Sequence, residues 1–166
     1  IIENSERLLF DLAEKGSFNS SLIKFDEAMR QTIEMAKRFV LFIFNEALCK
    51  YGQDLKHEQQ LTEIFADNFM DIYSAESTVV RAQKIMVSNL PEPTVVDIAK
   101  VFTAEMTNRF INQLHTAINA IFDGEPSDLI NQKVNEFESR MRLSTNVIGL
   151  KRNIANHVYE KNKYPY

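Results

Sequence analysis

The chain has 166 residues, a formal net charge of -4 and 45% hydrophobic residues. This length and apolar content suit one hydrophobic core, so we expect a single domain over residues 1–166. The basic residues are scattered among acidic ones, which disfavours nucleic acid and anionic lipid as main partners because clustered Lys and Arg bind both. With only 4 Gly and 4 Pro, the composition favours long helices joined by short turns, and the expected fold class is all-α.

Cysteine content and the apolar runs bear on the compartment. Cys49 excludes an internal disulfide and fits a reducing environment, so we expect a cytoplasmic protein. Within the helical run NEALCKYG, we predict that Cys49 is a buried, inert thiol. The longest apolar run, Phe39–Phe44, is far shorter than the roughly 20 residues of a membrane span. Because the sequence begins at Ile1 and not at Met, we also expect a fragment of a longer chain.

The first half of the chain predicts two helices. The first covers about residues 2–15, and residues 16–21 (GSFNSS) follow as a flexible connector. The second covers about residues 26–51 and ends at Gly52, a residue typical of the position after a helix. Around Val40 this helix is apolar on every side, so more than one neighbour must cover it. Those neighbours are either two bundle helices, or one helix and a surface outside this chain.

A third helix is predicted over about residues 56–88, and the two prolines of NLPEPT end it. Thr94 and Asp97 resemble a capping box that starts a fourth long helix, which Gly124 and Pro126 close.

Two shorter helices follow, the first capped by Ser127 and the second by Asn146 or Thr145. The segment NKYPY is expected to be an extended tail. These elements predict a bundle of three long antiparallel helices with shorter helices packed across it.

Glu76 raises the question of chemistry. In the third helix it falls within one apolar stripe at helical spacing, formed by Phe69, Ile72, Tyr73, Val79 and Val80. A carboxylate buried alone tends to stay protonated, as in a catalytic acid, whereas one paired with a cation is structural. Lys151 and Arg152 are candidate cations, and Arg81 is too distant for an ideal pair one turn away. Because neither a second acid nor a histidine lies nearby, we interpret Glu76 as a structural ion-pair residue.

Other catalytic patterns are missing from the sequence. Di-iron bundles use Glu-x-x-His pairs, but the residues three before His57, His115 and His157 are Asp54, Asn112 and Ile154. The chain also lacks a nucleophile elbow, a P-loop and a GxGxxG loop. We therefore predict no catalytic, cofactor-binding or metal-binding residues in this chain.

Three segments carry a family resemblance. The segment FADNFMDIYSAESTVVRAQKIM (residues 65–86) resembles a helix in the C-terminal extension of acyl-CoA dehydrogenases of the very-long-chain type. The segment FVLFIFNEALCKYGQDL (residues 39–55) is similar to the preceding helix of that extension, and LKRNIANHVYEKNKYP (residues 150–165) to its closing segment. The resemblance extends from about Phe25 onward and rests on helical packing patterns.

This resemblance implies that the FAD site, the acyl-CoA pocket and the catalytic base belong to a preceding dehydrogenase core. The intact protein would resemble a flavoenzyme that removes a proton from Cα and a hydride from Cβ of a fatty acyl-CoA. It would then pass the electrons to an electron-transfer flavoprotein. The implied partners of this chain are its own dehydrogenase core and a second subunit in a homo-oligomer. Membrane docking is attributed to animal relatives, but the acidic net charge disfavours it here.

Two other interpretations stay open at this point. One is a free-standing helical interaction module unrelated to flavoenzymes, and the other is a small bundle enzyme that uses Glu76 as an acid. The enzyme interpretation requires a pocket with a second titratable group.

Overall fold

A computed structural model describes residues 27–88 and 91–162. Its elements, in chain order, are α2 (Glu27–Tyr51), the 3-10 helix η1 (Gly52–His57), α3 (Gln59–Met86), α4 (Thr94–Ile121), α5 (Asp128–Met141) and α6 (Val147–Lys161). All regular structure in these two ranges is helical, which confirms the all-α class. The predicted helix over residues 2–15, the connector 16–21 and most of the predicted tail lie outside the described residues.

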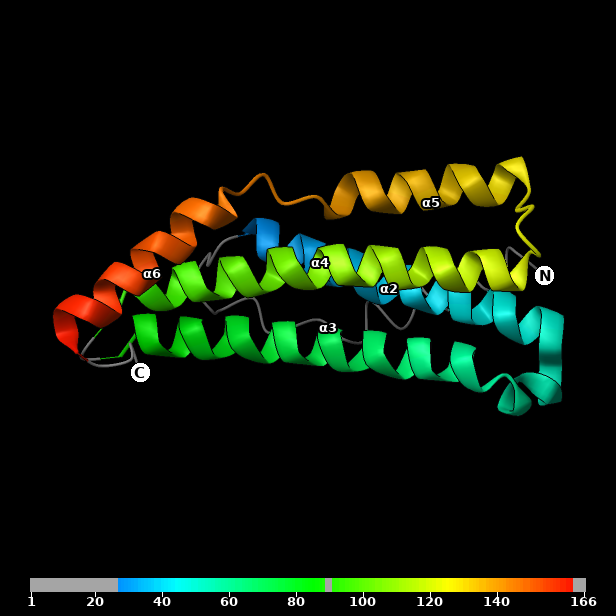
Figure 1. Cartoon of the computed structure of the whole chain (residues 1–166), viewed down its shortest axis with the longest axis horizontal. Coiled ribbons are helices and arrows are strands. Elements are labelled where there is room, and N and C mark those ends of the chain that lie inside the picture. Colours follow the sequence, from blue (N-terminus) through cyan, green and yellow to red (C-terminus); the bar gives the residue numbers. More distant parts are fainter. Residues whose placement is uncertain (1–26, 89–90, 163–166) are drawn as a thin grey trace.

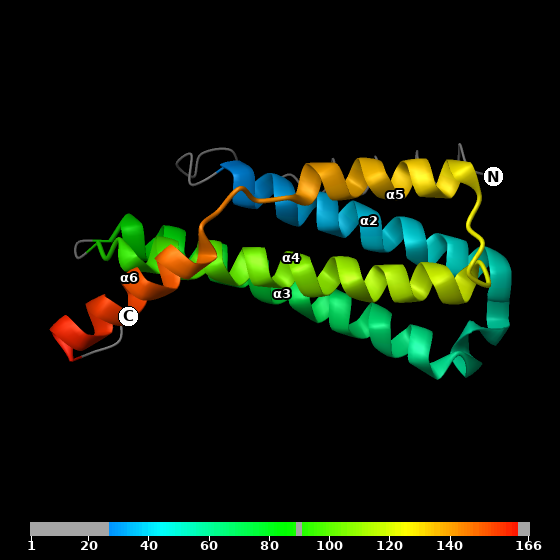
Figure 2. The ribbon, with the colours of Figure 1, turned by 45° about the horizontal axis from the view of Figure 1, so that its top comes forward.

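The three longest helices, α2, α3 and α4, lie lengthwise beside one another, and the chain reverses direction at each connection (Figure 1). Helix α5 packs along α2 instead of crossing it, and α6 packs on α4 at an angle to the long axis (Figure 2). Helix α2 therefore contacts α3, α4 and α5.

Local signals set several helix ends as predicted. Gly52 follows the last residue of α2 with a φ of 54°, a conformation that favours glycine. The hydroxyl of Ser127 accepts from the amide of Ile130 (3.4 Å) at the start of α5. The side chain of Asn146 accepts from the amide of Gly149 (3.0 Å) at the start of α6. Ser127 and Asn146 are thus confirmed as caps.

Two predicted helix starts are wrong. Residues 52–57 form η1, so α3 begins at Gln59 instead of about Lys56; burial of Leu55 holds this tight turn against the core. Thr94 is the first residue of α4 and not its cap. The carboxylate of Glu92 accepts from the Thr94 amide (3.3 Å), so Glu92 provides the acceptor that the capping box assigned to Thr94.

The core is built around α2. Phe39 and Val40, about 100° apart round this helix, are both fully buried, as is Ile43 between them in direction. The ring of Phe39 stacks on Phe137 of α5, with 5.0 Å between centroids, and makes an edge contact with Phe110 of α4 at 6.2 Å. Neighbours within the chain therefore cover most of the apolar girdle predicted around Val40.

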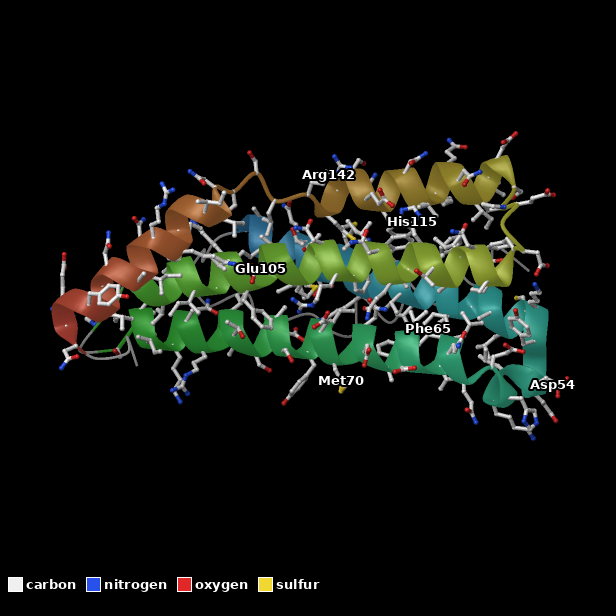
Figure 3. All side chains as sticks on the ribbon, viewed as in Figure 1. Asp54, Phe65, Met70, Glu105, His115 and Arg142 are labelled. Atoms are coloured by element: carbon white, nitrogen blue, oxygen red, sulfur yellow. The ribbon has the colours of Figure 1, made fainter. Side chains whose placement is uncertain are left out.

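The predicted apolar stripe of α3 is only partly a core stripe. The buried positions are Leu61, Phe65, Asn68, Ile72, Ala75 and Ala82, the heptad spacing of helices packed nearly parallel. Phe69 is 42% exposed and Tyr73 is 72% exposed, so the prediction that they belong to the core is wrong. Tyr73 follows the buried Ile72 and lies about 100° further round the helix. Figure 3 shows Phe65 pointing into the bundle and Met70 pointing away from it.

The ring contacts of Phe39 with Phe110 and Phe137 should contribute strongly to the stability of the fold. We expect Phe39→Ala to lower the free energy of unfolding by about 3–5 kcal/mol, because it removes a buried ring that two other rings contact. In residues 1–166 alone, Tyr73→Ala removes a ring of similar size from an exposed position and should change the free energy of unfolding by less than about 1 kcal/mol. Urea denaturation measures both changes; equal losses would contradict the core described above.

Candidate docking surface

Six apolar residues form a partly exposed surface where α2 and α3 run side by side. We call this surface the α2–α3 face; its members are Leu41, Phe44, Leu48, Phe69, Tyr73 and Val80. The ring of Phe44 lies 6.4 Å from that of Phe69, measured between centroids, so the two helices contribute to one surface. Leu48 and Val80 are 43% and 36% exposed. A contiguous apolar surface of this kind is typical of a contact with another protein surface.

An ion-pair cluster lies beside these apolar residues. The ammonium of Lys37 on α2 donates to the carboxylate of Glu76 on α3 (2.8 Å) and to that of Glu34 on its own helix (3.3 Å). Burial alone would lower the pKa of Lys37, but the hydrogen bond to Glu76 and the charges of Glu34 and Glu76 together raise it above the usual 10.5. The stabilisation from this pairing is thus complete at neutral pH and is lost only as the pH rises above about 10.5.

The partner of Glu76 differs from the predicted cations. Lys151 pairs with Glu105 of α4, Arg152 is exposed, and Arg81 lines a hollow next to α4. Glu76 is an ion-pair residue, as interpreted, but its cation is Lys37 of the neighbouring helix. Lys37 was not among the predicted cations, although Lys37 lies three residues after Glu34 and this spacing is a local signal of an ion pair.

Cys49 is exposed, so the prediction of a buried thiol is wrong. It lies two residues after the buried Ala47, in the last turn of α2, where Lys50 is also exposed. The side-chain amide of Asn45 makes a weak contact with the thiol sulfur (3.9 Å).

The three histidines lie on separate elements. His57 is exposed in η1, near Asp54 at one end of the bundle (Figure 3). His115 of α4 contacts Glu138 of α5, and His157 of α6 lies 3.4 Å from Glu92 in the turn before α4. In residues 27–88 and 91–162, no group of three or more His, Cys, Asp or Glu side chains is placed to hold a metal ion.

A hollow lies between α3 and α4. It has a volume of about 230 Å³, and its lining is mainly apolar: Thr78, Arg81, Ala82, Ile85, Val95 and Ile98. Sites for cofactors and drug-sized ligands usually span about 300–1,000 Å³ and place several polar groups around the ligand. These residues therefore do not fit FAD.

No helix of the described ranges is long and apolar enough to cross a membrane.

Glu46 of α2 is a half-buried carboxylate that was not predicted from the sequence. Burial raises its pKa above the usual 4.5, and no described residue gives it a hydrogen bond or an ion pair. The apolar run Phe39–Phe44, just before Glu46, was the sequence signal that this carboxylate lies partly buried. A lone carboxylate without an acid, base or ligand beside it has no defined chemistry.

The described residues thus form an all-helical domain whose main candidate functional feature is an apolar face with a charged cluster. The family model of the acyl-CoA dehydrogenase C-terminal domain matches residues 35–135, more than half of the chain. The chain belongs to this family.

Two known proteins extend this result. A probable acyl-CoA dehydrogenase of Bacillus subtilis is 26% identical over 141 residues, which cover 83% of this chain and 23% of that protein. The crystal structure of an acyl-CoA dehydrogenase complexed with FAD from Bacillus anthracis matches 99% of this chain with a TM-score of 0.79 and 23% identity. The match covers 28% of the Bacillus anthracis chain, so this chain corresponds to about a quarter of each relative.

The carboxylate of Glu46 provides a test of the burial described here. Because its pKa is raised, the folded state is more stable below the unfolded pKa, and this stability is lost as the pH rises through the folded pKa. We expect Glu46→Gln to raise the free energy of unfolding at pH 7 by up to about 0.5 kcal/mol, a small effect because water screens the group. The gain should vanish below about pH 4.5, as measured by urea denaturation across pH. A loss of stability at pH 7 would contradict this assignment.

Proposed function

We propose that residues 1–166 are the C-terminal helical domain of a longer FAD-dependent acyl-CoA dehydrogenase of the very-long-chain type. The family match and the name of the Bacillus subtilis relative support the enzyme class. Coverage of about a quarter of each relative supports a domain of a larger protein. These matches favour this proposal over a free-standing interaction module. The resemblance of residues 65–86 supports the very-long-chain type.

The function of the domain is to pack against the dehydrogenase core and to extend the contact with a second subunit. The α2–α3 face carries the packing on the core, because Leu48, Phe69 and Tyr73 expose apolar surface beside one another on two packed helices. The centres of protein interfaces are enriched in aromatic residues, as this face is. The core that the matches leave unaccounted for is the natural occupant of the face.

The domain contributes no reacting group in this proposal. FAD and the acyl-CoA would bind in the core. The three long helices would form an antiparallel bundle that supports the face. The proposal includes a homo-oligomer in the cytoplasm, and the acidic net charge agrees with a position away from anionic membranes.

The enzyme class has a spectroscopic test. Purified intact protein should show a visible flavin band that loses absorbance when a long-chain acyl-CoA is added, because the substrate reduces the flavin. A short-chain acyl-CoA should bleach the band less and provides the matched control. A colourless protein that releases no FAD on denaturation would contradict the proposed enzyme class.

Packing through the α2–α3 face has a mutational test. We expect Tyr73→Glu to destabilise the intact protein by about 2 kcal/mol or more, because it forces an unpaired carboxylate into the contact. Tyr159→Glu makes the same change on α6 at a tyrosine that is 82% exposed, and it should have little effect. Thermal unfolding and limited proteolysis of the two variants measure the difference. Equal behaviour of the two variants would show that the face is not buried in the intact protein.

A further inference from the structure

We infer that the surface covering the α2–α3 face carries a cationic side chain opposite Glu34 and Glu76. This inference rests on the proposed function, because it takes the dehydrogenase core of the intact protein as the occupant of the face. It adds the chemistry of the counterpart, which is an apolar surface with a basic group beside it.

The charges of Glu34, Lys37 and Glu76 do not cancel within the ion-pair cluster. Glu34 and Glu76 share the single ammonium of Lys37, at 3.3 Å and 2.8 Å. Among the described residues, two carboxylates and one ammonium leave one negative charge without a partner. The side chains of Glu34, Lys37 and Glu76 are 41%, 32% and 33% exposed, so the group is partly open to solvent.

The other described cations on these helices form no ion pair with Glu34 or Glu76. Arg38 lies one turn after Glu34 on α2, but the two form no ion pair, and the Nε of Arg38 is buried without a hydrogen-bond partner. The guanidinium of Arg30 pairs with Glu27 at 3.5 Å. Lys84 follows Glu76 by eight residues, which places it about 12 Å further along α3. Arg81 lines the hollow on the side of α3 that faces α4. The negative charge therefore stays beside the apolar residues of the face.

Covering the α2–α3 face would remove water from this negative charge, which costs free energy. The ion-pair cluster has Leu41 and Phe44 beside it on α2, and Tyr73 and Val80 beside it on α3, so a surface that buries these residues also removes water from Glu34 and Glu76. A desolvated charge without a partner is strongly unfavourable, whereas a complementary cation offsets the cost and fixes orientation. Arginine suits this position because its planar group can bind two carboxylate oxygens at once.

The same charge argues against a second copy as the occupant. In a two-fold symmetric contact whose axis passes near the cluster, each cluster would meet another cluster of the same sign. Juxtaposed like charges suppress such pairing. The dehydrogenase core is not restricted in this way and can supply the cation.

Oxidative footprinting of the intact protein tests the inference. The measured quantity is the rate at which Tyr73 is labelled, with Tyr159 as the internal reference for an exposed tyrosine. Glu34→Lys leaves the pair of Lys37 and Glu76 in place but reverses one charge that faces the partner, and Glu76→Lys reverses the other. Glu136→Lys is the matched control, because Glu136 is 45% exposed and pairs with Lys133 and Arg140 on α5, away from the face.

We expect Tyr73 to be protected in the wild-type protein and its labelling to rise at least about tenfold in Glu34→Lys, because the partner's cation would then meet a like charge. Glu76→Lys should do the same, and Glu136→Lys should change the rate by less than about twofold. Cross-links from Lys37 should end outside residues 1–166.

Other outcomes separate the two proposals. If Tyr73 is protected in the wild type and stays protected in both face variants, the cation is wrong while the packing stands. If Tyr73 is labelled as fast as Tyr159 in the wild type, the packing fails and the inference fails with it. Protection that grows with protein concentration, or Lys37 cross-links that end within residues 1–26, would identify a different occupant and overturn the inference.

Discussion

The covering of α2 is the constraint on which the other helices depend. Successive residues of a helix lie about 100° apart, so Phe39 and Val40 point in different directions, and both are fully buried. No single neighbour can bury both sides. Helix α5 brings Phe137 onto Phe39, α4 brings Phe110, and α3 packs along the remaining flank. Helices α3, α4 and α5 each return along α2, whereas α6 packs on α4.

This arrangement leaves the outer edge between α2 and α3 unfinished. Phe44 contacts Phe65 in the core (5.1 Å between ring centroids) and Phe69 at the surface, so the core continues without a break into the α2–α3 face. The pair of Lys37 and Glu76 joins the two helices at the same edge. A surface built in this way holds its shape before it meets a partner, which lowers the entropic cost of binding. The bundle thus acts as a rigid support for a contact surface.

Features that depend on neighbouring residues could be read from the sequence. Gly52, Ser127 and Asn146 set helix ends through their own backbone preferences and hydrogen bonds, and all three positions were predicted. The rotation of α3 could not be read, because Phe69 and Tyr73 are more hydrophobic than the buried Asn68 and Ala75. A stripe that meets a partner has the composition of a core stripe. The pairing of Lys37 with Glu76 spans 39 positions and depends on the packing of two helices.

An experimental structure of the intact protein is the most direct test of the central claim that the α2–α3 face is a docking surface. The account predicts that Phe69, Tyr73 and Val80 contact residues of the dehydrogenase core and that a basic side chain of that core reaches Glu34 and Glu76. A structure in which these three apolar side chains face solvent would contradict the claim, and the function of the domain would then have to be sought on another surface.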